Sequence, residues 1–176
     1  MALIIYDYMG DFEKAIDGLA KVKLDGKWGY INMTGKEVIP CKYDSIGDFS
    51  DGLSLVKLDG KYGFIDKKGK EVIPIKYDSA ESFKNGLSLV KLDGKYGFID
   101  KKGKEVIPIK YDSAESFKNG LAWVKLNGKC GFIEKKGKKV ILKIIPKVKL
   151  NGIKSAIVNV RLNNKYGFYR GRGNGK

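Results

Sequence analysis

Residues 53–77 read LSLVKL-DG-KYGFID-KKGK-EVIPIKY, and this stretch decides the predicted fold. Three segments rich in β-branched and aromatic residues are separated by Asp59-Gly60 and by the lysine-rich residues 67–70. An Asp-Gly pair between apolar segments is typical of a tight β-hairpin, since Gly accepts a positive φ without steric cost. Pro74 cannot donate a ladder hydrogen bond, which places the third strand at a sheet edge. The stretch therefore predicts a three-stranded antiparallel meander.

This meander recurs with a period of 34 residues. Residues 51–84 and 85–118 are identical except at the first position, which is Asp51 in one and Asn85 in the other. A meander of this length cannot bury both of its faces, so neighbouring units are expected to stack in a single repeat array. We expect the array to consist of a half unit at 1–16, full units at 17–50, 51–84 and 85–118, a degenerate unit at 119–156, a half unit at 157–170 and a basic Gly-rich tail at 171–176.

The expected fold is all-β, with about five stacked units. An open β-solenoid and a closed propeller-like ring both allow such stacking. The two half units are complementary, because a third-strand segment in 1–13 could complete the first and second strands of 157–170. This complementarity favours the closed ring over the open solenoid. The link from Asp78 to Gly86 is expected to be a helical turn whose Phe83 plugs the core.

The two faces of the first strand differ in how much they vary between units. The face that carries Val56 stays small or apolar in every copy, which indicates core. The opposite position varies: it holds Lys21, Leu55, Leu89, Trp123 and Asn159. A position that changes residue type is expected to be solvated or to face a ligand. Leu55, Leu89 and Trp123 are therefore candidate binding residues, and for Trp123 contact with a neighbouring unit is the alternative.

Residues 26–32, GKWGYIN, and residues 35–40, GKEVIP, resemble the repeat of the bacterial WG-repeat (KWG) family. The resemblance extends over residues 6–170. The Trp-Gly pair that names the family and its counterparts in the later units are Trp28-Gly29, Tyr62-Gly63, Tyr96-Gly97, Cys130-Gly131 and Tyr166-Gly167. The family is β-rich and is usually regarded as an interaction module without a known active site. The resemblance thus implies a binding role and transfers no catalytic residue.

The residues that could carry chemistry favour structural roles. The sequence has no His, which excludes imidazole as base, nucleophile or metal ligand. Asp66 and Asp100 are copies in adjacent units and lack the asymmetric environment that a catalytic pair needs, and lysines beside Asp59 argue against calcium. Cys41 and Cys130 take the places of apolar residues, so we expect buried hydrophobes rather than zinc ligands or a disulfide. The sequence predicts no enzyme, no metal site and no cofactor.

The formal charge of +15 is unevenly distributed. Residues 119–176 carry a net charge of +14, whereas residues 1–118 are close to neutral. This basic segment is a candidate site for nucleic acid or an anionic surface, with affinity falling as salt rises. Its candidate residues are Lys135, Lys136, Lys138, Lys139, Lys143, Lys147 and Lys149.

The expected function is a non-catalytic scaffold that binds another protein. The alternatives are polyanion binding through the basic segment and recognition of a polymeric glycan by identical units in register. The first cation is Lys14, so the N-terminus lacks a basic leader, and no apolar run is long enough to span a bilayer. These features predict a cytoplasmic protein, unless the chain was cut from a longer exported one.

Overall fold

In a computed structural model, residues 4–11, 18–136, 139–144, 157–162 and 165–170 are described, with side chains for 4–11 and 18–134. Contacts divide the chain into two units, Met1–Ile144 and Ile145–Lys176. Every regular element in the described residues is a β-strand. The all-β prediction is therefore confirmed.

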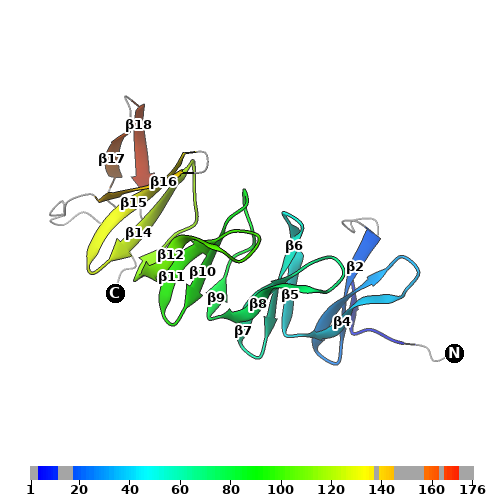
Figure 1. Ribbon diagram of the computed structural model, residues 1–176. Coiled ribbons are helices and arrows are strands. Elements are labelled where there is room, and N and C mark those ends of the chain that lie inside the picture. Colours follow the sequence, from blue (N-terminus) through cyan, green and yellow to red (C-terminus); the bar gives the residue numbers. More distant parts are fainter. Residues whose placement is uncertain (1–3, 12–17, 137–138, 145–156, 163–164, 171–176) are drawn as a thin grey trace. The chain divides into compact units, whose positions relative to one another are not determined.

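Four antiparallel sheets of four strands each follow one another along the described part of the first unit (Figure 1). The first sheet contains β1 (Tyr8–Met9), β2 (Leu19–Leu24), β3 (Lys27–Asn32) and β4 (Glu37–Tyr43). The second contains β5 (Ser45–Ser50), β6 (Leu53–Leu58), β7 (Lys61–Ile65) and β8 (Glu71–Tyr77). The third contains β9 (Ser79–Ala80), β10 (Ser88–Leu92), β11 (Lys95–Ile99) and β12 (Glu105–Tyr111). The fourth contains β13 (Ser113–Ala114), β14 (Leu121–Leu126), β15 (Lys129–Lys136) and β16 (Lys139–Ile144), and the second unit holds the hairpin β17 (Ile157–Leu162) and β18 (Lys165–Arg170).

The repeating unit has four strands, which corrects the prediction of three. The linker expected to be a helical turn forms β9, which pairs antiparallel with β10. The backbone N–H of Asp78 donates to the carbonyl oxygen of Lys91 at 2.9 Å, so the linker satisfies its polar groups along the open edge of the meander. Phe83 occupies the core as predicted: it is 2% exposed, and its ring centroid lies 4.7 Å from that of Phe64.

The N-terminal strand belongs to the first sheet. Tyr8 pairs with Lys23 and Met9 pairs with Val22. Ser45 and Ile46 make the corresponding pairs one repeat later. This segment is thus the edge strand of its own unit, not a third strand for residues 157–170. Because no closed sheet occurs among the described strands, the closed ring is not supported.

Local residue chemistry explains the turns and the strand order. Asp59 and Gly60 have φ values of 49° and 79°, which suits the two-residue hairpin between β6 and β7. The Asp66 carboxylate accepts hydrogen bonds from the backbone N–H groups of Lys68 and Lys70, each at 2.9 Å, and so fixes the next turn. In the second sheet β8, which contains Pro74, is an edge strand as predicted.

Gly63, which follows Tyr62, lies in close contact with the backbone of the third strand of its sheet. The pairing of β7 with β8 shifts register between Tyr62 and Phe64, so the third strand bulges. A Cβ atom placed on Gly63 would lie 2.7 Å from the Cα of Ile75 and 2.8 Å from the carbonyl oxygen of Ile73. Only glycine permits this approach. Gly97 has the same relation to Ile109, at 2.7 Å.

Neighbouring sheets share their cores. Ile75, which lies over Gly63, packs with Tyr43 of the first sheet and Val56 of the second. Ile109, which lies over Gly97, packs in the same way between the second and third sheets. Buried residues of this shared core are Leu53, Phe64, Ile73, Tyr77, Phe83, Val90 and Ile99. The bulge therefore places an isoleucine side chain between the first and second sheets and another between the second and third.

We expect Gly97→Ala to destabilise the protein by about 1–3 kcal/mol, the usual cost of overpacking. The new methyl group would meet the Cα of Ile109 at 2.7 Å and the carbonyl oxygen of Ile107 at 2.8 Å, and these backbone atoms cannot move aside cheaply. Chemical denaturation followed by circular dichroism measures the change.

The matched control is Gly47→Ala. A Cβ atom on Gly47 would lie 3.4 Å from its nearest neighbour, the carbonyl oxygen of Leu55, which is an ordinary contact. The positions that correspond to Gly47 in the next two units hold Glu81 and Glu115, so a side chain is tolerated there. Its free energy of unfolding should stay close to that of the unsubstituted protein. Equal losses in the two variants would contradict the close-approach account.

Candidate functional site

Two of the proposed binding residues lie between sheets. Leu89 is 7% exposed and packs with Ala122 and Val124 of the next sheet, and Leu55 packs against the core shared by the second and third sheets. The expectation of a solvated position is therefore corrected. In the first sheet the residue at this position is Lys21, whose ammonium pairs with the Asp48 carboxylate of the second sheet at 2.9 Å.

The aromatic residues of the repeat signature also lie at sheet faces. Trp28 packs edge-on against Tyr8 at 5.4 Å between ring centroids, and the Lys23 ammonium lies 5.4 Å from the Trp28 ring. Tyr62 and Tyr96 each carry a lysine ammonium over the ring, at 5.3 and 5.2 Å. The three contacts between a lysine and an aromatic ring are cross-strand pairs within one sheet. Tyr166 and Gly167 lie on β18, whose backbone alone is described.

The structure describes the remaining predicted binding residues only in part. Trp123 is half-buried on β14, where its carbonyl oxygen accepts the backbone N–H of Glu115 at 3.0 Å. The predicted basic residues Lys135, Lys136, Lys139 and Lys143 lie on β15 and β16, and their side chains fall outside the described residues. Lys138, Lys147 and Lys149 lie wholly outside them. A binding role for all these residues stays a prediction.

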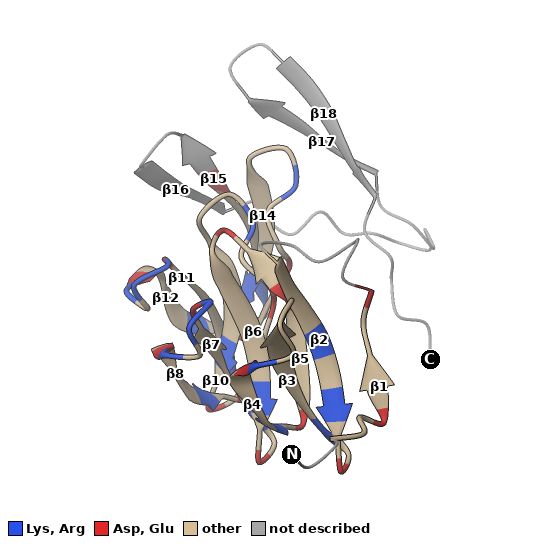
Figure 2. Cartoon of the chain, turned by 90° about the vertical axis from the view of Figure 1, so that its right-hand side faces the viewer, with Lys and Arg blue, Asp and Glu red and all other residues tan. Residues whose placement is uncertain are grey.

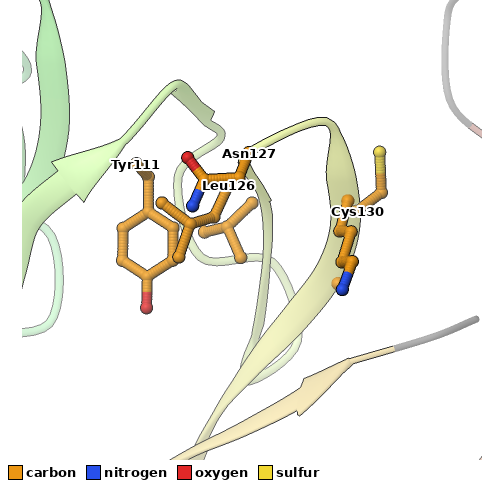
Figure 3. A pocket seen from close by; sticks show the side chains of 7 residues that line it. Tyr111, Leu126, Asn127 and Cys130 are labelled. Carbon is orange, nitrogen blue, oxygen red and sulfur yellow. The ribbon is translucent and has the colours of Figure 1, made fainter.

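An open, mainly apolar cavity of about 240 Å³ lies where the third sheet meets the fourth (Figure 3). Tyr111 of β12 and Leu126 of β14 lie on one side of it, and Cys130 of β15 lies on the other. The lining residues are Tyr111, Val124, Leu126, Asn127, Lys129, Cys130 and Gly131.

The cavity occupies the place that an isoleucine fills in the preceding units. One repeat earlier, the counterparts of Tyr111, Val124 and Leu126 pack with Ile109. In the fourth unit the counterpart of Ile109 is Lys143. The fourth unit thus keeps the glycine and the apolar walls, and its sequence has no aliphatic residue at the position of Ile109.

The fourth sheet also loses the bulge. In the third sheet Phe98 pairs with Ile107, with register shifts on either side. In the fourth, pairing runs without interruption from Gly131 with Ile144 to Lys136 with Lys139. Glu134 replaces Asp100, whose carboxylate fixes the preceding turn. Turns of this kind are formed by Asp and Asn side chains, so Glu134 is not expected to fix the same turn. The strand therefore continues past the turn, and the pairing register shifts.

A charged contact holds the hairpin at the edge of the cavity. The Asp112 carboxylate accepts hydrogen bonds from the Lys95 ammonium and from the backbone N–H of Asn127, each at 2.7 Å. The Lys95 contact and the Asn127 amide lower the pKa of Asp112 below its usual value. Asp78 makes the equivalent contacts with Lys61 and Gly94 one repeat earlier.

A second surface, which we call the edge stripe, consists of the exposed residues of β4, β8 and β12. It combines apolar side chains with charged side chains of both signs. Figure 2 shows the charged residues in blue and red. Val72 and Val106 are 36% and 37% exposed, large values for valine on a strand. The residues of the stripe are Glu37, Pro40, Lys42, Glu71, Val72, Pro74, Lys76, Glu105, Val106, Pro108 and Lys110.

Other kinds of site find no support in the described part of the chain. It contains no cluster of residues that could hold a metal ion, and no helix in it has the length and apolar character to span a bilayer. Cys41 is half-buried against the first sheet, as expected for a small hydrophobe. Cys130, which lines the cavity, is exposed, and this corrects the prediction that it is buried.

Sequence reasoning missed both the cavity and the edge stripe. The signal for the cavity was the replacement of Ile109 by Lys143 while Gly131 was retained. The signal for the stripe was a repeated valine beside the proline of an edge strand. Neither signal distinguishes a site from an ordinary repeat position until the packing is known.

We expect Asp112→Asn to lower the melting temperature at pH 7. A carboxylate whose pKa is lowered by folding stabilises the protein above its unfolded pKa of about 3.9, and this contribution is lost as pH falls through the folded pKa. The difference in melting temperature between the variant and the unsubstituted protein should therefore shrink between pH 7 and pH 3. Calorimetry over this range measures it.

Asp93→Asn is the matched control, because the next hairpin naturally has Asn127 at this position. Its melting temperature should stay near that of the unsubstituted protein at pH 7. A difference for Asp112→Asn that is as large at pH 3 as at pH 7 would disprove the carboxylate's role.

Solved structures resemble the chain only weakly. A protein of unknown function from Bacteroides caccae is 13% identical with a TM-score of 0.33, over 82% of this chain and 64% of that one. A plant albumin from Cicer arietinum showing hemagglutination is 13% identical with a TM-score of 0.29, over 82% and 92%. A 2S albumin seed protein from Dolichos is 12% identical with a TM-score of 0.29, over 82% and 93%. The chain spans less than two thirds of the Bacteroides structure, and no conclusion rests on these likenesses.

A comparison with curated proteins gives no match. The family model of the WG-containing repeat, in contrast, matches four times in tandem. The matched segments are 4–28, 28–62, 62–96 and 96–130, so they cover most of the chain and repeat with the period of the four-stranded sheets. The chain therefore belongs to the family of WG-containing repeat proteins.

Proposed function

We propose that the protein is a non-catalytic scaffold that binds another protein through the edge stripe. The observation that carries this proposal is the exposure of Val72 and Val106 at the same place in consecutive units. Exposed aliphatic side chains bordered by charges are typical of protein-binding surfaces. The second and third units add the same group of side chains, so contacts can be made at both units together.

The stripe is continuous from unit to unit within the first three sheets. The turn that contains Gly69 lies against β4 of the preceding sheet, where a Cβ atom on Gly69 would be 3.3 Å from Ile39. The turn that contains Gly103 lies against Ile73 of β8 in the same way, at 3.5 Å. The turn before each of these edge strands therefore lies against the edge strand of the preceding unit, and one extended partner can contact several units.

Recognition would use the side chains of the stripe rather than added strands. Pro40, Pro74 and Pro108 remove a backbone donor from each edge strand, and exposed lysines accompany them. Proline and lysine at a sheet edge oppose pairing with a further strand. The partner would therefore present apolar and charged side chains, and it would not complete the sheet.

Affinity capture with the full chain tests the proposal. The double variant Val72→Lys, Val106→Lys should reduce the amount of captured protein about tenfold or more, since buried apolar contacts supply most interface energy. Mass spectrometry of the eluted proteins, with nuclease added throughout, measures the loss.

Met33→Lys is the matched control. Met33 is 75% exposed outside the stripe, and Lys67 holds its place in the next unit. This variant should capture the same proteins as the unsubstituted chain. Equal capture by the double variant would overturn the edge stripe as the binding surface.

Polyanion binding is the second candidate function. Residues 119–176 carry a net charge of +14, which favours association with phosphate backbones or anionic surfaces. Titration of a generic DNA duplex at 50 and 200 mM salt tests it, and a loss of affinity of roughly 10³-fold or more over this range is expected if several lysines contact phosphates. Absence of binding at the lower salt concentration would eliminate this candidate.

A further inference from the structure

The second and third sheets show which side chain fits the position that corresponds to the cavity in the fourth unit. Ile75 and Ile109 reach the equivalent places in the second and third sheets from the bulged third strand. In each case the neighbours include the tyrosine that ends the preceding sheet, Tyr43 or Tyr77. The preceding units thus indicate that a branched aliphatic side chain matches these walls.

The cavity is large enough and open enough to accept such a group from outside. Its volume of about 240 Å³ exceeds the roughly 150 Å³ of cavities that bind benzene-sized molecules. Val124 and Leu126 provide apolar walls, and Tyr111 provides a ring face. Burial of an aliphatic side chain against such walls is favourable in proportion to the apolar area that leaves water.

The charge around the cavity selects among possible ligands. Lys129 lines it and is exposed, whereas the nearby Asp112 carboxylate is engaged by Lys95 and by the Asn127 amide. Lys125, which lies between Val124 and Leu126 on β14, is also exposed. A ligand with carboxylates next to its aliphatic group is therefore favoured over a neutral or basic one.

We propose that this cavity binds a branched aliphatic side chain of an acidic peptide segment on a partner protein. The inference rests on the proposed scaffold function and adds a site separate from the edge stripe. The aliphatic side chain takes the place that Ile109 fills one unit earlier, and the flanking carboxylates lie near Lys129. Binding at the cavity and binding at the stripe are tested by different variants, so failure of one does not imply failure of the other.

A synthetic peptide derived from residues 105–111 provides the probe. The capped sequence EVIPIEY keeps the isoleucine of the internal reference and has Glu in place of its Lys. Isothermal titration of this peptide into the full chain should give a saturable signal. The peptide EVIPGEY should bind about tenfold more weakly or worse, because it lacks the buried aliphatic group.

Two variants of the chain locate the site. Leu126→Trp fills the cavity and should abolish binding of EVIPIEY. Lys129→Glu keeps the apolar walls formed by Tyr111, Val124 and Leu126 and should weaken binding about three- to tenfold, with a smaller effect at high salt. Lys68→Glu makes the same charge change at an exposed turn of the second sheet and should bind as the unsubstituted chain does.

Three results would overturn the proposal. EVIPIEY and EVIPGEY could bind equally well or not at all, or Lys129→Glu and Lys68→Glu could have equal effects. Light scattering could show a dimer that Leu126→Trp converts to a monomer, which would assign the cavity to a second copy of the chain. None of these results would affect the comparison of Val72→Lys, Val106→Lys with Met33→Lys.

Discussion

The close approach of a bulged edge strand to a glycine is the contact on which the repeat depends. Gly63 and Gly97 lie so near the third strand that even a methyl group would meet its Cα and carbonyl atoms. This approach turns Ile75 and Ile109 toward the preceding sheet, where they join the shared cores. One residue without a side chain thus links pairing within a sheet to packing between sheets.

The absence of this bulge distinguishes the fourth unit from the second and third. In the fourth unit Gly131 remains, but the third strand pairs without a bulge, and the sequence counterpart of Ile109 is Lys143. The result is a cavity walled by Tyr111 and Leu126, in the part of the chain where the positive charge collects. In a repeat array each unit is stabilised mainly by its neighbours, so a local change alters one interface and leaves the others intact.

Local signals in the sequence predicted much of the fold. The period, the Asp59-Gly60 hairpin and the edge position of Pro74 follow from backbone chemistry and are confirmed. The fourth strand did not follow, because a two-residue strand such as β9 has no periodicity to detect. The burial of Leu89 did not follow from the sequence either. A position that varies between units reads like a solvent-exposed one even when it is buried between sheets. The cavity depends on a pairing register that the sequence does not specify alone.

Restoring the missing contact tests this account most directly. A variant would give the fourth unit the third-strand residues of the third unit and the Asp of the turn before that strand. The substitutions are Glu134→Asp in the turn and Lys139→Glu, Leu142→Pro, Lys143→Ile, Ile144→Lys and Ile145→Tyr in the strand. Its control would carry all of these changes except Lys143→Ile. We predict that calorimetry shows a melting temperature roughly 2–8 °C above that of the control, as expected for a filled cavity. Equal melting temperatures for the two variants would contradict the glycine-and-bulge contact as the basis of packing between sheets.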